Sequence, residues 1–278
     1  MSREWRTGRS GSDVQQKLRE AVTPRPDPAF AARLRQEFVR DASAKASAPI
    51  VSLKPRRSGQ ALLVGALAMA AALAVVWTAN RGPSWGVHAT TGSGAIRMDE
   101  WAVDAADRAG VMRRLHPGVA IEVPENAQLD LELPGIALFQ VTGGTRMVLP
   151  ASPGRWFGRA VSGRVEAGEL RIATGPGFRG SNLTFVTATA EVRITGTTLA
   201  ILAPPEGACV CVFEGRAEMR DSVHGMAPVI EGTRRVVFRD ARAPLTEPIR
   251  PMESAKLGML REEAARTLGS NSIGHIPD

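Results

Sequence analysis

The sequence predicts a mainly β domain, a sandwich or short solenoid of antiparallel-type strands, preceded by one transmembrane helix and a small helical arm. Three observations predict this arrangement. An apolar run over 61–79 contains no charged residue, the whole net charge of +7 lies before residue 60, and short runs of alternating polarity follow the apolar run. With 44% hydrophobic and 23% charged residues among 278, the chain can build a globular core, which excludes a wholly disordered protein.

The apolar run matches the thickness of a bilayer. At about 1.5 Å of rise per residue, a helix over 61–79 extends about 28 Å, close to the ~30 Å hydrocarbon core. A cleaved signal peptide would lie near residue 1, whereas about sixty mostly polar residues precede this run. The alternative is a buried Ala-rich helix in a soluble domain, although such helices rarely lack polar positions on every face. We therefore expect an uncleaved membrane anchor at 61–79.

Charges beside the run indicate its orientation. Three Lys and Arg residues lie within the seven positions before it, and Arg81 is the only cation close behind it. Cations are enriched on the cytoplasmic side of a span, so residues 1–58 are expected in the cytoplasm and residues 82–278 outside it. Trp77 and Trp85 are expected at the far lipid–water interface, where indole rings lie half in lipid.

Residues 1–58 are predicted to form a cytoplasmic arm of two short helices and a linker. Asp27-Pro28 is a start signal for the second helix, over 28–42, with the carboxylate as N-cap. Because two short helices make a poor core, its apolar face needs a partner: a second copy, the membrane surface, or a cytoplasmic protein that accepts a helix in a groove. The alternative is a flexible basic arm that only sets topology. The expected partner-binding residues of this face recur at helical spacing and are Phe30, Leu34 and Phe38.

Residues 87–250 are predicted to form the β-domain. Runs of alternating polarity recur roughly every ten residues and are separated by Gly, Pro and Asn, which is typical of β-structure. Strands are expected at 119–123, 129–133, 168–172, 183–187, 191–194, 199–202, 209–213 and 235–238. The C-terminal part, 251–278, is expected to be a helix over 254–268 followed by a tail. The helix should end at Gly269, and its apolar face consists of Leu257, Leu260, Ala264 and Leu268.

The arm also carries a family pattern. The stretch DPAFAARLRQEF, which begins at Asp27, resembles the cytoplasmic segment of bacterial anti-sigma factors, which often show Asp-Pro-x-Phe-x-x-x-Leu. The zinc signature of one class of these domains, a His followed by Cys-x-x-Cys, is absent, because both cysteines lie beyond residue 200. The resemblance implies a sigma factor or another transcription regulator as the cytoplasmic partner.

Two further motifs occur in order within 160–220. The first is Val192-x-Ile194-x-Gly196-Thr197-x-Leu199, and the second is Val210-x-Val212-x-Glu214-Gly215. Together they resemble the core of a FecR-type domain, the exported sensor of membrane-bound sigma regulators, with Leu199 in place of the usual Phe. Gly196, Thr197, Glu214 and Gly215 are expected at strand ends in a structural role, because glycine permits positive φ and close approach of chains.

No motif predicts a catalytic site, a metal or a cofactor. Gly175–Gly180 satisfies G-x-G-x-x-G, but a strand follows in place of the helix that a nucleotide site requires, so a β-turn loop is expected. The four histidines lack metal or triad spacing and are expected at the surface. Cys209 and Cys211 share one face of a strand. Buried thiols are the first interpretation, and a redox or metal role is the alternative.

These features lead to the hypothesis of a non-enzymatic, single-pass regulator in a bacterial inner membrane. Its exported domain would respond to an envelope signal, an envelope protein or a polymer, and its arm would hold a transcription factor, most directly a sigma factor. The resemblance also implies release by proteolysis at the membrane. Direct contact with nucleic acid is not expected, because the excess of cations is confined to the arm. The alternative is a membrane-anchored envelope scaffold or binding module with no regulatory role.

Overall fold

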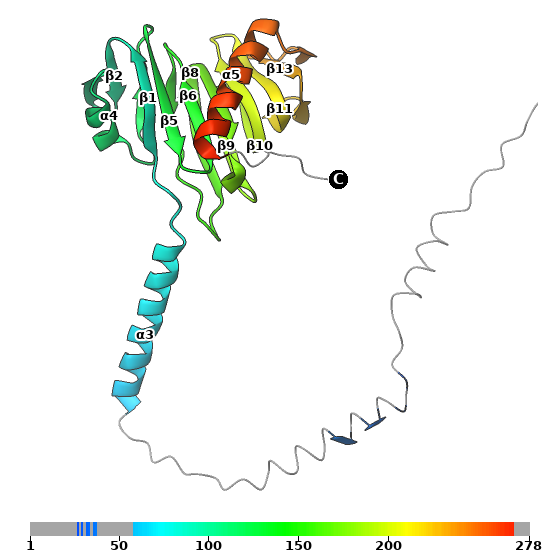
Figure 1. Cartoon of the computed structure of the whole chain (residues 1–278). Coiled ribbons are helices and arrows are strands. Elements are labelled where there is room, and N and C mark those ends of the chain that lie inside the picture. The colour runs from blue at the N-terminus through cyan, green and yellow to red at the C-terminus, as the bar shows by residue number, and fades with distance from the viewer. Residues whose placement is uncertain (1–26, 28, 30–31, 34–35, 38–57, 270–278) are drawn as a thin grey trace, which may run out of the picture. The chain divides into compact units, whose positions relative to one another are not determined.

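The computed structural model describes residues 27, 29, 32–33, 36–37 and 58–269 (Figure 1). The chain divides into two units, residues 1–66 and 67–278. In the first unit, the described residues after Asp27 are helical. The Asp27 carboxylate accepts a hydrogen bond of 2.9 Å from the amide of Ala29, which confirms the predicted N-cap. Phe30, Leu34 and Phe38 lie outside the described residues.

Helix α3 covers Ser58–Ala79 and contains the run 61–79, which was expected to be helical. Its side chains are described from Ala68 onward, and four of its large apolar side chains are 63–66% exposed: Met69, Leu73, Val75 and Trp77. Among the residues that the structure describes, no helix combines the length and the apolar character that a bilayer crossing requires.

The β-domain is a sandwich made by bending one hydrogen-bonded sheet. Its three longest strands, β8 (Ala160–Thr174), β10 (Ala190–Ala203) and β11 (Gly207–Asp221), run through both layers, because each half of each strand pairs with different neighbours. The described pairings are antiparallel, except that β8 and β9 (Asn182–Val186) run parallel. We call the two layers the helix-covered layer and the open layer.

Each layer adds shorter strands to the halves of β8, β10 and β11. The helix-covered layer adds β1 (Gly86–Gly92), β5 (Ala127–Leu133), β6 (Ala137–Val141), β13 (Thr233–Phe238) and β14 (Leu245–Pro248). The open layer adds β2 (Ala95–Met98), β3 (Trp101–Asp104), β4 (Ala120–Glu122), β7 (Arg146–Val148), β9 (Asn182–Val186) and β12 (Gly225–Ile230). The main core lies between the layers and includes Leu131, Phe139, Ile201, Ile121, Phe185 and Val192.

Helix α5 (Pro251–Leu268) lies across the outer face of the helix-covered layer (Figure 1). Its buried face is the predicted one, Leu257, Leu260, Ala264 and Leu268, and Gly269 follows it with φ +100°. These side chains pack on Leu138, Ala173, Ala200 and the two cysteines. The helix therefore buries a sheet face that would otherwise meet water, which is why residues 199–202 are apolar at successive positions.

The structure differs from the expected elements at several places. The predicted strands 191–194 and 199–202 are one strand, β10, because a bulge lets the chain continue from one layer into the other. The C-terminal helix starts at Pro251, three residues early, because Pro suits the first turn. A short helix over Arg108–Arg114, α4, was not expected; its N-cap is Asp107, which accepts from the amide of Gly110 at 2.8 Å.

Trp85 also lies elsewhere than expected. It was expected at a lipid–water interface, but it is 5% exposed and lies in the core of the β-domain. Its indole Nε1 donates to the carbonyl of Pro150 at 2.8 Å, and its ring lies 4.7 Å from that of Phe139. Burial is favourable here because the polar edge of the ring finds an acceptor.

Gly215 provides the first test of the bent sheet. It has φ +85°, and a Cβ atom there would lie 2.7 Å from the carbonyl oxygen of Gly196. Gly225 has φ +75° with nothing within 4 Å of its Cβ position, so Gly225→Ala measures the backbone cost alone, about 1 kcal/mol. Gly215→Ala should lower the free energy of unfolding by about 1–3 kcal/mol more, because the crowded Cβ adds overpacking. Urea unfolding in detergent compares the two; equal losses would contradict the crowding.

Candidate functional site

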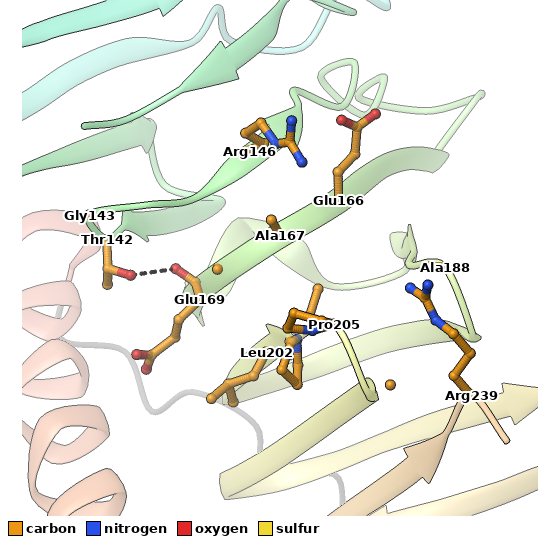
Figure 2. Close-up of a pocket in the computed structure, with 14 residues that line it drawn as sticks. Thr142, Gly143, Arg146, Glu166, Ala167, Glu169, Ala188, Leu202, Pro205 and Arg239 are labelled. Carbon is orange, nitrogen blue, oxygen red and sulfur yellow. Dashed lines mark hydrogen bonds between the residues drawn. The ribbon is translucent and has the colours of Figure 1, made fainter. Parts of the chain in front are cut away.

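A hollow of about 600 Å³ opens beside the bend of β8, where that strand passes from one layer to the other (Figure 2). Its wall is built by the β6–β7 turn, the bend of β8 and the β10–β11 turn, and Arg239 adds a side chain after β13. Its lining includes Thr142, Arg146, Glu166, Glu169, Leu202, Pro204 and Arg239.

Hydrogen bonds hold the β6–β7 turn against β8 at the base of this hollow. The hydroxyl groups of Thr142 and Thr145 each donate to the carbonyl of Glu169 at 3.0 Å, the first of which is drawn in Figure 2. The Thr145 hydroxyl also accepts from the amide of Glu169 at 3.0 Å. The Glu169 carboxylate is paired with Arg171, with 2.6 Å between Nε and Oε1. This part of the wall is therefore satisfied and fixed.

Three charged residues of the rim, Arg146, Glu166 and Arg239, are exposed. Arg146 and Glu166 lie on one side of the hollow and Arg239 on the other (Figure 2). None of the three forms an ion pair with a charged side chain that the structure describes. A second hollow of about 290 Å³ shares Arg146 and Glu166 and adds the Arg97–Glu122 pair, whose atoms lie 4.0 Å apart.

The arginine and glutamate side chains of its lining set the chemistry of the larger hollow. It contains no His, Cys or Ser, and its Thr142 hydroxyl is already a donor to a carbonyl. The Glu169 carboxylate is already paired with Arg171, which leaves two guanidinium groups and the Glu166 carboxylate. Such a set can hold an anionic or zwitterionic group, because Arg presents paired N–H donors to carboxylates and phosphates. In the described part of the chain, no cluster of His, Cys, Asp and Glu is arranged to hold a metal ion.

The FecR-like motif residues Gly196, Thr197, Glu214 and Gly215 lie close to one another, at a different place from the hollow. Thr197 pairs with Gly215 and Thr198 with Glu214, and the register of β10 and β11 shifts on both sides of these pairs. These positions are inside two long strands and not at strand ends, which corrects the expectation. The reason is that the two strands bulge and continue into the second layer.

Side-chain contacts link this bulge to its surroundings. The Thr174 hydroxyl accepts from the amide of Thr197 at 2.8 Å, which joins β8 to β10. The Glu214 carboxylate is paired with Arg261 of α5, and the amide of Gly215 donates to the Glu231 carboxylate at 3.2 Å. The four motif residues thus connect three strands, one turn and a helix, and none lines the hollow.

The two cysteines are buried and free, which confirms the first interpretation. Their Sγ atoms lie 3.8 Å apart on one face of β11, and Cys211 donates to Glu253 of α5 at 3.6 Å. The hydrogen bond with Cys209, together with burial, raises the pKa of Cys211. That thiol is therefore protonated and acts as part of the packing under α5.

A cluster of polar side chains lies between β1, β5 and α5. His88 was expected at the surface, but its side chain is only 26% exposed and lies between two carboxylates, 3.6 Å from Glu132 and 3.2 Å from Glu263. Asp130 of β5 accepts from Gln128 at 3.0 Å. Burial raises the pKa of Asp130, although the bond from Gln128 and the charge of His88 act in the other direction.

The glycine-rich segment 175–180 is confirmed as a loop element. Pro176–Phe178 form a single 3₁₀ turn, and strand β9 follows at Asn182. A nucleotide site needs the N-terminus of an α-helix at this place, and the structure places a strand there.

Sequence reasoning missed the residues of the hollow. Arg146, Glu166 and Arg239 are single charges in or beside strands, and tens of residues separate them. A lone charge in an alternating strand normally marks the solvent face. The fold brings these three positions together around the bend of β8.

Comparison with known proteins gives distant structural neighbours only. The chain matches no protein-family model and no curated protein sequence. Two crystal structures, each of a candidate anti-sigma factor from Parabacteroides distasonis ATCC 8503, are similar to it. The first has 19% identity and a TM-score of 0.39, and the match covers 46% of this chain and 59% of that one. The second has 15% identity and a TM-score of 0.41, with 55% and 75% covered. At TM-scores below 0.5, the likeness assigns neither fold nor function.

A substitution of Asp130 tests the cluster of polar side chains between β1, β5 and α5. A carboxyl whose pKa is raised in the folded state contributes stability below its unfolded pKa and loses that contribution as the pH rises through the folded value. Asp130→Asn, which keeps an acceptor for Gln128, should therefore raise the urea midpoint at pH 7. The gain should vanish below about pH 4, where the unfolded carboxyl is also protonated.

The matched control is Asp240→Asn, at a side chain that is 67% exposed, which should change the midpoint little at either pH. A loss of stability in Asp130→Asn that is the same at both pH values would show that the ionised carboxylate is favourable in its place.

Proposed function

We propose that the protein is a single-pass regulator of a bacterial inner membrane, with its N-terminal arm in the cytoplasm and its β-domain exported. The β-domain responds to an envelope signal, and the arm holds a cytoplasmic transcription regulator, most directly a sigma factor. The regulator acts by binding and not as an enzyme. The observation on which the proposal rests is the uncharged run 61–79 within α3, placed between a basic arm and a mainly β domain.

Helix α3 supports the anchor. The run of 61–79 lies wholly within its 22 residues, and the described apolar side chains from Met69 to Trp77 are exposed. Exposed apolar surface on this scale is costly in water. A hydrocarbon environment removes that cost, and the cations before the run favour a cytoplasmic N-terminus.

The arm supports the regulatory half of the proposal. The Asp27 N-cap begins a helix at the position that the anti-sigma-like pattern requires. The face proposed for the partner consists of Phe30, Leu34 and Phe38, which lie outside the described residues. An arm that served only as an anchor would need no such face, so the pattern favours a bound protein.

The hollow beside β8 supports a second candidate, an envelope scaffold or binding module. Arg146 and Arg239 could hold an anionic group of an envelope protein or polymer. In this reading the arm is only an anchor. In the leading proposal, the same hollow is where the signal binds.

Topology is the first test of the proposal. A phosphatase reporter that folds only outside the cytoplasm, fused after Asp278, should be active, and the same reporter fused after Ser52 should be inactive. The cations before 61–79 and the length of the run give this order. The reverse pattern of activities would overturn the orientation and the function built on it.

The arm is the second test. The double change Leu34→Ala, Phe38→Ala should release the cytoplasmic partner, because truncating a large anchor in a packed interface costs about 2 kcal/mol or more, roughly thirtyfold in affinity. Co-purification of a sigma factor with the full chain in detergent measures this release, and membrane fractionation shows that the variant keeps its anchor.

Arg33→Ala is the matched control. Arg33 is exposed, and its Nε donates to the carbonyl of Ala29 within the same helix. This change should leave the partner bound. If the parent chain retains no transcription regulator, or the double variant retains it equally well, the scaffold function replaces the regulatory one.

A further inference from the structure

We propose that the loop over 150–159 is a second membrane contact, which rests on the surface of the outer leaflet and takes up anionic lipid headgroups. The inference rests on the proposed function, because it requires that 61–79 spans the bilayer. Three features lead to it: the hydrogen bonds that tie the loop to the end of α3, two exposed aromatic side chains, and a local excess of arginine.

Hydrogen bonds fix the loop at the end of α3. Asn80 directly follows the last residue of the helix, and its Oδ1 accepts from the amides of Trp156 at 2.8 Å and Phe157 at 2.9 Å. Its Nδ2 donates to the carbonyl of Phe157 at 3.1 Å, and its own carbonyl accepts from the amide of Arg155 at 2.9 Å. The loop therefore lies at the depth at which the helix leaves the bilayer.

The aromatic side chains of the loop remain exposed. Trp156 and Phe157 are each 59% exposed, although their backbone groups are bound to Asn80. Phe157 and Trp77 border the same hollow of about 400 Å³, so the loop and the last turn of the helix face one space. Trp is enriched at the lipid–water interface, where its ring can be half dehydrated. These are the aromatic residues that fill the role first expected of Trp85.

Arginines surround these rings, and carboxylates are missing from the neighbouring segments. Arg159 donates to the carbonyls of Arg155 and Arg179, which brings three arginines together, and Arg81 stacks on Trp77 at 4.1 Å. None of the four pairs with a carboxylate in the described part of the chain. The segments 58–98, 134–165 and 170–190 contain no Asp or Glu. A surface of this charge is complementary to anionic headgroups.

The choice of a lipid surface over a protein partner follows from position. A patch that is bound to the residue directly after a membrane helix lies at the level of the lipid headgroups. Aromatic rings with flanking cations match that region in both polarity and charge. The contact would hold one end of the β-domain on the bilayer.

The test uses the full chain in nanodiscs made of phosphatidylcholine and phosphatidylglycerol at a ratio of 3:1. A fluorophore that responds to polarity is attached through Phe157→Cys, while Cys209 and Cys211 are 6% and 0% exposed and should not be labelled. The backbone bonds to Asn80 do not depend on the replaced ring. We expect blue-shifted emission and quenching by brominated lipid.

The matched control is Met252→Cys, at a side chain that is 71% exposed in the first turn of α5. The far end of α5, at Leu268, borders Gly175 in the segment next to Arg179. Sixteen residues of helix place Met252 about 24 Å from that end. This label should show water-like emission and no quenching. In the Phe157→Cys background, Arg155→Glu with Arg179→Glu should reduce the quenching at least twofold, as should pure phosphatidylcholine.

The outcomes separate the contact from the anchor. Water-like emission at both sites in chains that are incorporated into nanodiscs overturns the contact and leaves the anchor standing. A chain that does not incorporate overturns the proposed function and the contact together. Blue-shifted emission that rises with protein concentration and is not quenched by brominated lipid means that a second copy covers the patch, which also overturns the contact. Equal quenching in both lipid mixtures overturns the preference for anionic headgroups.

Discussion

The close approach of β10 and β11 at Gly196 and Gly215 is the constraint on which the sandwich depends. Gly215 has φ +85°, and the carbonyl oxygen of Gly196 lies so close that a side chain at Gly215 would not fit. The register shift there bends both strands, so that their halves belong to different layers. Because both layers share these strands, the core between them is continuous. Arg261 of α5 pairs with Glu214 at the same point, which seats the helix over the layer that it covers.

The sequence predicted the features that follow from a regular spacing of apolar residues. Alternating runs located the positions of strands, and the spacing of Leu257, Leu260, Ala264 and Leu268 located the buried face of α5. Prediction failed for features that depend on how distant segments of the chain pack together. Residues 191–194 and 199–202 looked like two strands because their patterns differ. They are one strand with different neighbours, since α5 covers the outer face of only the second part.

Composition alone could not assign the tryptophans or the charged residues. Trp77 lies at the end of the apolar run and is 63% exposed. Trp85 follows the run by a few residues, yet it is buried in the core, and the carbonyl of Pro150 accepts its N–H. The sequence also contained no indication that the charged residues of the hollow lie together. An arginine on the solvent side of a strand gives no signal that a bend will place it at the rim of a hollow, so Arg146 and Arg239 could be recognised only in three dimensions.

The hollow and the end of α3 are joined by a short stretch of chain. Arg146 lines the hollow at the start of β7, and β7 ends at Val148, two residues before the start of the loop that binds Asn80. Beyond the loop the chain returns along β8 to Glu166 at the same hollow. A ligand held between the rim charges would therefore contact both strands that carry the loop. It could act on the helix only if it bound two arrangements of this connection with different affinity, because binding without such a difference shifts no equilibrium.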